Sequence, residues 1–152
     1  MKILILIVGK PKDKRVSALA AEYLARIRPG LVAVESVADR PTGSHEERIE
    51  RAGQEILHKL RPRDRLILLS EYGSEYNSEA FAALVSREME TAPGRIVLAI
   101  GGPWGVSGAV KKRADFLLSL SRMTFPHELC FLFLAEQLYR AFSILQGSKY
   151  HH

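Results

Sequence analysis

Hydrophobic and polar positions along the chain predict strands and helices in regular succession. Short runs that are apolar on both faces and rich in β-branched residues are typical of buried parallel strands. Segments with apolar residues at helical spacing separate these runs. The expected strands are 3–8, 31–37, 65–69, 96–100 and 116–120, and the expected helices are 16–27, 44–60, 77–89, a short one from 107, and 126–146. This βαβα order predicts one α/β domain over residues 1–152, with a parallel sheet and helices on both of its faces.

Local chemistry marks where several of these helices begin. Ser44 and Glu47 have the spacing of a capping box, in which each side chain accepts a hydrogen bond from the other residue's backbone N–H. Ser107 precedes the short helix, and Pro126 stands at a first helical position, which proline favours.

Two irregular loops follow the last two expected strands. Residues 101–105, Gly-Gly-Pro-Trp-Gly, follow the strand 96–100, and residues 121–127 follow the strand 116–120. Open α/β sheets bind ligands at the carboxyl ends of their strands, so we expect a ligand crevice between these loops. Glycines let backbone approach a ligand, but a tight structural turn explains them equally well. Their spacing is neither the dinucleotide fingerprint nor the phosphate loop.

The second loop combines hydroxyl, cationic and apolar side chains beside a helix start. Met123 and Phe125 are suited to hold an adenine ring while backbone groups bind its polar edge. Alternatively, Thr124 caps the last helix and His127 lies in its first turn. A lone histidine forms no catalytic constellation, so a structural or solvated His127 is the more common case.

The last helix carries Glu136 and Arg140 four residues apart, hence on one face and able to pair. Such pairs usually lie on a solvated face. Here, however, apolar residues surround almost the whole helix, so both of its faces require cover. A subunit interface would cover the second face.

The charge balance favours a polyanionic partner. The 22 Lys and Arg against 17 Asp and Glu give a net charge of +5 and a pI near 9.5. Lys111, Lys112 and Arg113 are candidate phosphate contacts, although such clusters are more often solvated. In the tail, Lys149, Tyr150 and His151 form a plausible set for contacting an exposed RNA base. The alternative is a frayed terminus or the remnant of a tag.

Other features exclude several protein classes. The single Cys130 permits no intramolecular disulfide, which suits a reducing cytoplasm. No group of histidine, cysteine and carboxylate residues has metal-ligand spacing. The apolar run 3–8 is followed by no cleavage site and is far too short to cross a bilayer. We therefore expect a cytoplasmic protein with neither a metal nor a membrane partner.

Four motifs in order resemble the ribosomal large-subunit methyltransferase H family, a small single-domain branch of the SPOUT methyltransferases. They are I-G-G-x-x-G at 100–105, L-S-x-x-T-x-P-H at 120–127, E-Q-x-Y-R-A at 136–141 and Y-H at 150–151. The opening K-I-x-I-x-x-V-G-K at 2–10 also matches, so the resemblance covers essentially the whole chain. The chain departs from the family at Phe131 and His152, where basic residues are usual, so RNA or interface roles at those positions are not transferred.

The resemblance implies a homodimer, a C-terminal trefoil knot, and N3-methylation of a pseudouridine in 23S ribosomal RNA with S-adenosylmethionine as the methyl donor. The patterns alone would not have predicted a knot, because knots are nearly absent from folds. By the same resemblance, the cofactor contacts fall on Leu69, Gly101, Leu120, Ser121, Arg122, Met123, Thr124 and Phe125. These residues lie at the strand ends that the crevice argument selects independently.

We hypothesise that Arg140, oriented by Glu136, stabilises the target ring, and that His127 or His151 handles the N3 proton. Two other classes remain open at this stage. A non-catalytic RNA-binding α/β domain would explain the basic clusters, and a nucleotide-dependent α/β enzyme would explain the glycine loop. Calorimetry with S-adenosylmethionine and NAD separates the three.

Overall fold

The structure is a computed structural model that describes residues 2–152, which form five strands and five helices in alternation. The strands are β1 (Ile3–Val8), β2 (Val32–Val37), β3 (Arg65–Glu75), β4 (Ile96–Ile100) and β5 (Phe116–Ser119). The helices are α1 (Lys14–Ala25), α2 (His45–Lys59), α3 (Ser78–Thr91), α4 (Gly108–Arg113) and α5 (His127–Leu145). All strand pairs are parallel, in the order β2-β1-β4-β3-β5, which confirms the expected α/β class.

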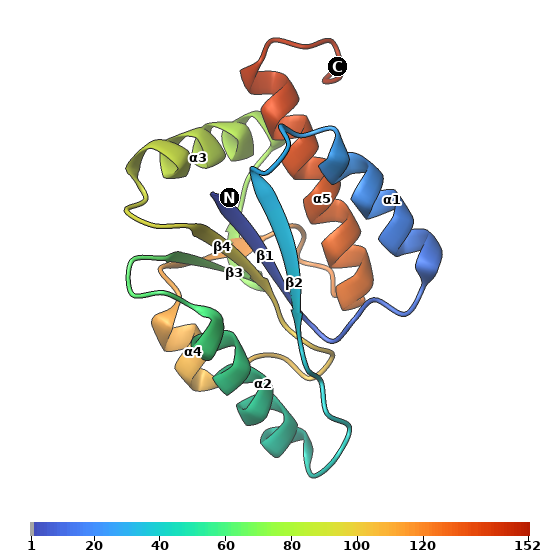
Figure 1. Ribbon diagram of the computed structural model, residues 1–152, viewed down its shortest axis with the longest axis vertical. Helices are drawn as coiled ribbons and strands as arrows, with labels where there is room; N and C mark the ends of the chain where they lie inside the picture. The colour runs from blue at the N-terminus through green and yellow to red at the C-terminus, as the bar shows by residue number, and fades with distance from the viewer. Residues whose placement is uncertain (1) are drawn as a thin grey trace.

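The sheet lies between two helical layers (Figure 1). Helices α1, α3 and α5 cover one face, and α2 and α4 cover the other. The central strand β1 shows why its sequence is apolar throughout: Ile3, Ile5 and Ile7 pack into the first layer, whereas Leu4, Leu6 and Val8 pack into the second. Burial on both faces is what the continuous apolar runs predicted.

Side chains cap most of the helices as the sequence indicated. Ser44 and Glu47 form the predicted capping box at the start of α2. Asn77 caps α3 and Ser107 caps α4. The start of α5 differs, because Pro126 occupies its N-cap position and no side chain caps it. The alternative role of Thr124 as the cap of α5 is therefore wrong.

Strand β3 is longer than the sequence predicted, because it pairs with β5 twice. Leu69 pairs with Leu118, residues 70–73 leave the ladder, and Ser74 pairs with Leu118 again. The residues that leave are polar or exposed, so their pattern gave no strand signal. Gly73 lies so close to β5 that a Cβ atom there would be 2.6 Å from the carbonyl carbon of Leu117. The second pairing thus depends on a residue without a side chain.

The trefoil knot and the domain boundaries 1–152 stay predictions. Strands β3 and β5 are adjacent at one edge of the sheet, and helix α5 packs beside both α1 and α3. Of these elements, β5 and α5, together with the start of α3, line the cavity of the candidate site.

Gly73→Ala should destabilise the protein by about 1–3 kcal/mol, because the added methyl group forces the backbones of β3 and β5 apart. Urea unfolding followed by circular dichroism measures the change. Gly108→Ala is the matched control: a Cβ atom at this helical position meets nothing within 4 Å, so it should be neutral or slightly stabilising. Equal stability of the Gly73→Ala variant and the unsubstituted protein would show that the second β3–β5 pairing is not tightly held.

Candidate functional site

Three of the predicted ligand-binding stretches lie level with one another on neighbouring strands. Leu68 pairs with Ala99, and Leu69 pairs with Leu118, so Leu69 lies beside the ends of β4 and β5. The expectation that Leu69 ends its own strand is wrong, because β3 continues to Glu75. Gly101 follows β4 directly, and Leu120 follows β5 directly. The crevice rule therefore selected positions that the fold does bring to one edge.

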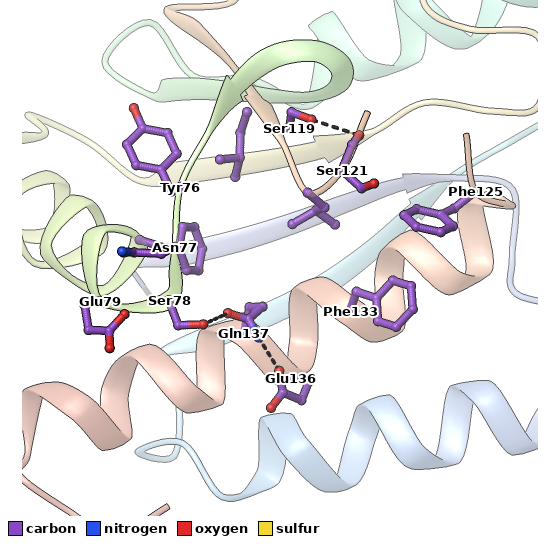
Figure 2. Close-up of a pocket in the computed structure, with 13 residues that line it drawn as sticks. Tyr76, Asn77, Ser78, Glu79, Ser119, Ser121, Phe125, Phe133, Glu136 and Gln137 are labelled. Carbon is purple, nitrogen blue, oxygen red and sulfur yellow. Dashed lines mark hydrogen bonds between the residues drawn. The ribbon is translucent and has the colours of Figure 1, made fainter. Parts of the chain in front are cut away.

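A cavity of about 560 Å³ opens between the end of β5, the start of α3 and the middle of α5 (Figure 2). This volume is within the range of small-molecule and cofactor sites. One wall comes from residues 118–121 together with Phe125, and another from residues 76–79 together with Phe81. Helix α5 completes it with Phe133, Glu136 and Gln137.

The loop after β5 is held in place by its own hydrogen bonds. The Ser119 hydroxyl donates to the backbone oxygen of Ser121 at 2.9 Å, and the Met123 N–H donates to the Ser121 hydroxyl at 3.0 Å. The Phe125 ring meets Phe133 edge to face, with 5.3 Å between the centroids. Of the predicted cofactor residues, Leu120, Ser121 and Phe125 therefore line the cavity, on a loop with a fixed shape.

The other predicted cofactor residues do not line this cavity. Leu69 is half-buried and packs against the core, while the loop at Gly101 folds toward Gly105. Arg122 is exposed, with its Nε 3.5 Å from Glu75, and Met123 is 73% exposed. Thr124 is also exposed.

The sequence reasoning missed two polar parts of the cavity. Residues 76–79 join β3 to α3, and Gln137 neighbours Glu136 on α5. The Ser78 hydroxyl donates to Gln137 Oε1 at 2.9 Å, and Gln137 Nε2 donates to Glu136 Oε2 at 2.6 Å (Figure 2). Asn77, Ser78 and Glu79 follow a strand as closely as the residues that were selected, so the same strand-end rule could have found them had the end of β3 been placed at 75.

A second cluster joins the tail to α5 and to the start of α3. Arg140 Nε donates to Glu136 Oε1 at 2.9 Å, and the Tyr150 hydroxyl donates to the same oxygen at 3.2 Å. His151 Nδ1 lies 3.3 Å from Arg140 Nη1, and its Nε2 lies 2.8 Å from Glu79 Oε1. Since Glu79 and Glu136 also line the cavity, the tail reaches the cavity edge within the same chain.

The charges in this cluster shift the acid–base properties of its members. Hydrogen bonds to Glu136 raise the pKa of Arg140, which keeps the guanidinium cationic. The hydrogen bond from His151 lowers the pKa of Glu79. Burial, followed by the neighbouring Tyr23 and Glu136, raises the pKa of Tyr150 to about 12. The cluster thus holds a fixed cation beside a phenol that stays protonated at neutral pH.

His127 lies at the opposite end of α5 from this cluster. Arg140 lies thirteen positions further along the helix, a rise of roughly 20 Å. Its Nε2 is instead close to β1, 4.0 Å from a Cβ atom built on Gly9. Of the two histidines considered for proton transfer, only His151 contacts Arg140 in this chain.

The basic residues of α4 lie on the other side of the sheet from the cavity. Lys111 and Lys112 are exposed. The Arg113 guanidinium is engaged within the protein: it donates to the Asp64 backbone oxygen at 2.7 Å and pairs with Asp115 at 3.3 Å. Lys149 in the tail is exposed.

Residues 2–152 contain no group of three or more histidine, cysteine or carboxylate side chains placed to hold a metal ion. None of the helices in that part of the chain combines the length and the apolar character that crossing a bilayer requires.

Comparison with known proteins gives matches over the full length. The family described as Predicted SPOUT methyltransferase matches residues 1–151. The chain is similar to Ribosomal RNA large subunit methyltransferase H of Porphyromonas gingivalis, at 42% identity over 100% of this chain and 99% of that protein. The protein of the same name from Streptococcus agalactiae is 40% identical, over 99% of each.

A solved structure shares the fold. It is a probable methyltransferase from Bordetella pertussis Tohama I, with a TM-score of 0.56 at 13% identity, covering 92% of this chain and 93% of that one. Identity this low shows the fold alone.

Glu136→Gln should lower the pKa of Tyr150 from about 12 toward the ordinary value near 10, because it removes the negative charge that opposes phenolate formation. Ultraviolet difference absorbance during an alkaline titration measures the phenolate, with Tyr150→Phe assigning the signal among the five tyrosines. A raised pKa of this kind stabilises the docked tail below pH 10, and the stabilisation is lost as pH rises through about 12.

The matched control is Glu90→Gln, which removes an exposed carboxylate from α3 and should leave the titration unchanged. A phenol at position 150 that titrates near 10 in the unsubstituted protein would contradict the docked arrangement of the tail.

Proposed function

The chain belongs to the ribosomal RNA large subunit methyltransferase H branch of the SPOUT methyltransferase family, and we propose that it methylates N3 of a pseudouridine in 23S ribosomal RNA with S-adenosylmethionine as donor. The observation that carries the proposal is the 42% identity to a protein of that name across the whole of both chains. The cavity at the predicted cofactor loop supports it.

The residues of the cavity fit the cofactor chemically. S-adenosylmethionine, when bound, supplies a methyl group on a positively charged sulfur. Phe125 and Phe133 offer apolar ring surface suited to a nucleobase, and Ser121 offers polar groups for its edge. Glu79 and Glu136 line the same cavity and offer carboxylate oxygens to a cationic ligand. We propose that Leu120, Ser121 and Phe125 contact the cofactor directly, and that Leu69, Gly101, Arg122, Met123 and Thr124 complete the site when it is bound.

Removing the N3 proton leaves negative charge on the target ring, which the protein must offset. Arg140 is the cation suited to this role, since Glu136 fixes its direction through hydrogen bonds and keeps it charged. His151 contacts Arg140, so we favour it over His127 for accepting the proton. The Arg140 guanidinium carbon lies 4.8 Å from the centroid of the Tyr150 ring, and this cation–π contact limits where Arg140 can move.

We further propose a homodimer that acts in the cytoplasm on ribosomal RNA. Leu19 on α1 and Leu145 on α5 are each more than 40% exposed, and a second copy would cover such apolar side chains. Exposed Lys149 and the tail residues Tyr150 and His151 would contact RNA beside the cavity, and Lys111 and Lys112 would contact phosphates elsewhere. Arg113 is left out of this role because Asp64 and Asp115 hold its guanidinium.

The direct test is mass spectrometry of ribosomal RNA from cells that lack this protein, before and after treatment with the purified protein and S-adenosylmethionine. The expected result is one added methyl group on a pseudouridine of 23S RNA. Calorimetry with S-adenosylmethionine runs in parallel. RNA binding without methylation and without saturable cofactor binding would favour the non-catalytic RNA-binding domain instead.

Arg140→Ala should reduce the methylation rate at saturating RNA by at least about 100-fold, because it removes the charge that stabilises the deprotonated ring. Cofactor affinity, measured by calorimetry, should not change. Arg87→Ala, which removes an exposed arginine from α3, is the control and should keep full activity. Full turnover by the Arg140→Ala variant would remove Arg140 from the proposed role.

A further inference from the structure

Trp104 lies at the tip of a tight turn whose residues do not line the cavity. Gly105 N–H donates to the Gly102 backbone oxygen at 3.1 Å, which closes a four-residue turn with Pro103 and Trp104 in its central positions. Gly105 has a φ of +97°, a conformation that suits glycine. Trp104 is 47% exposed, although large aromatic rings usually bury most of their surface. The loop therefore holds an exposed indole in a defined place.

A second ring fixes the orientation of this indole. The imidazole of His45, the first residue of α2, stacks on Trp104 with 3.6 Å between ring centroids and 16° between ring planes. The guanidinium of Arg48 lies 6.0 Å from the indole centroid, and Asp39 holds it through two hydrogen bonds of 2.9 Å. The ring is thus held in one orientation before a ligand binds, so binding loses little side-chain conformational entropy.

Exposed basic residues lie in the loops next to this turn. The loops after β1 and β2 begin at the same end of the sheet as the loop that carries Trp104, because all three strands are parallel neighbours. Lys10, Lys12 and Arg40 in these loops are exposed. Carboxylates lie there too, since Glu46 and Glu47 occupy the first turn of α2 beside His45. The ring surface of the indole, more than the local charge, therefore indicates what binds here.

From this geometry we propose that Trp104, backed by His45, is a stacking platform for an unpaired nucleobase of the RNA substrate. An exposed indole that packs on a second ring offers aromatic surface on which an unpaired base can stack, and exposed basic residues at the same end of the sheet offer charge for the RNA backbone. The platform packs on the α2 side of the sheet, whereas the cavity lies on the α3 and α5 side, so both can be occupied together. The inference rests on the proposed function in taking RNA as the substrate, and it adds a subsite outside the cofactor cavity.

The sole tryptophan of the chain reports this contact directly. Titration of the protein with a single-stranded RNA dodecamer of adenosine and uridine should quench its fluorescence saturably, because stacking on a base quenches indole emission. A duplex of the same sequence, whose bases are already stacked and paired, should not quench it. Quenching that is absent with the single strand, or equal with the duplex, would overturn the proposal.

Variants measure how much the platform contributes to RNA binding. Trp104→Ala should raise the Kd for the dodecamer and the KM for ribosomal RNA by about 5- to 150-fold. It should leave the cofactor Kd and the rate at saturating RNA unchanged, and Trp104→Phe should recover part of the loss. His45→Ala should weaken RNA binding less than Trp104→Ala, and His58→Ala, which removes an exposed imidazole at the far end of α2, should have no effect.

The outcomes separate this inference from the proposed function. If the unsubstituted protein methylates RNA but Trp104→Ala keeps the same KM, only the platform is refuted. If the protein neither binds S-adenosylmethionine nor methylates RNA, the proposed function fails, while the quenching titration still decides whether Trp104 binds a base. A change of sedimentation coefficient in Trp104→Ala, with unchanged RNA affinity, would assign the ring to a contact between subunits and overturn the proposal.

Discussion

The interrupted pairing between β3 and β5 is the constraint on which the candidate site depends. Without the excursion at 70–73, the chain would leave the sheet at Leu69, and α3 would begin elsewhere. The second pairing, at Ser74 and Glu75, carries the chain back along β5 and delivers residues 76–79 to α5. These residues form one wall of the cavity, the loop after β5 forms another, and α5 completes it. Gly73 makes this possible, since only backbone fits against Leu117 there.

Helix α5 links the cavity to the tail through shared side chains. Glu136 lines the cavity with one part of its surface, while its Oε1 accepts hydrogen bonds from Arg140 and Tyr150. Glu79 similarly lines the cavity and contacts His151. The cavity and the tail therefore share two carboxylates, which fixes the position of the tail relative to the cavity.

The site residues differ in how readily the sequence revealed them. Leu120 ends the run 116–120, and Ser121 and Phe125 lie in the loop after it, so the strand-end rule selected this place independently of the family resemblance. Glu136 and Arg140 were found by helical spacing, and they do pair. Residues 76–79 were missed because the polar stretch 70–75 carries no strand pattern. His127 was selected for its type and its neighbours in sequence, but the length of α5 separates it from Arg140.

The sequence by itself determined the order of the elements, the burial of the sheet on both faces, and most of the helix starts. These depend on interactions between residues close in the chain: alternating burial along a strand, helical periodicity, and side chains such as Ser44 that bond the nearest free backbone N–H groups. The tertiary structure alone decided that β3 pairs with β5 twice, that His151 meets both Glu79 and Arg140, and that Trp104 stacks on His45. These contacts join residues that are 11 to 72 positions apart in the chain. No local period encodes such contacts, because they form only where the packing of whole elements brings the residues together.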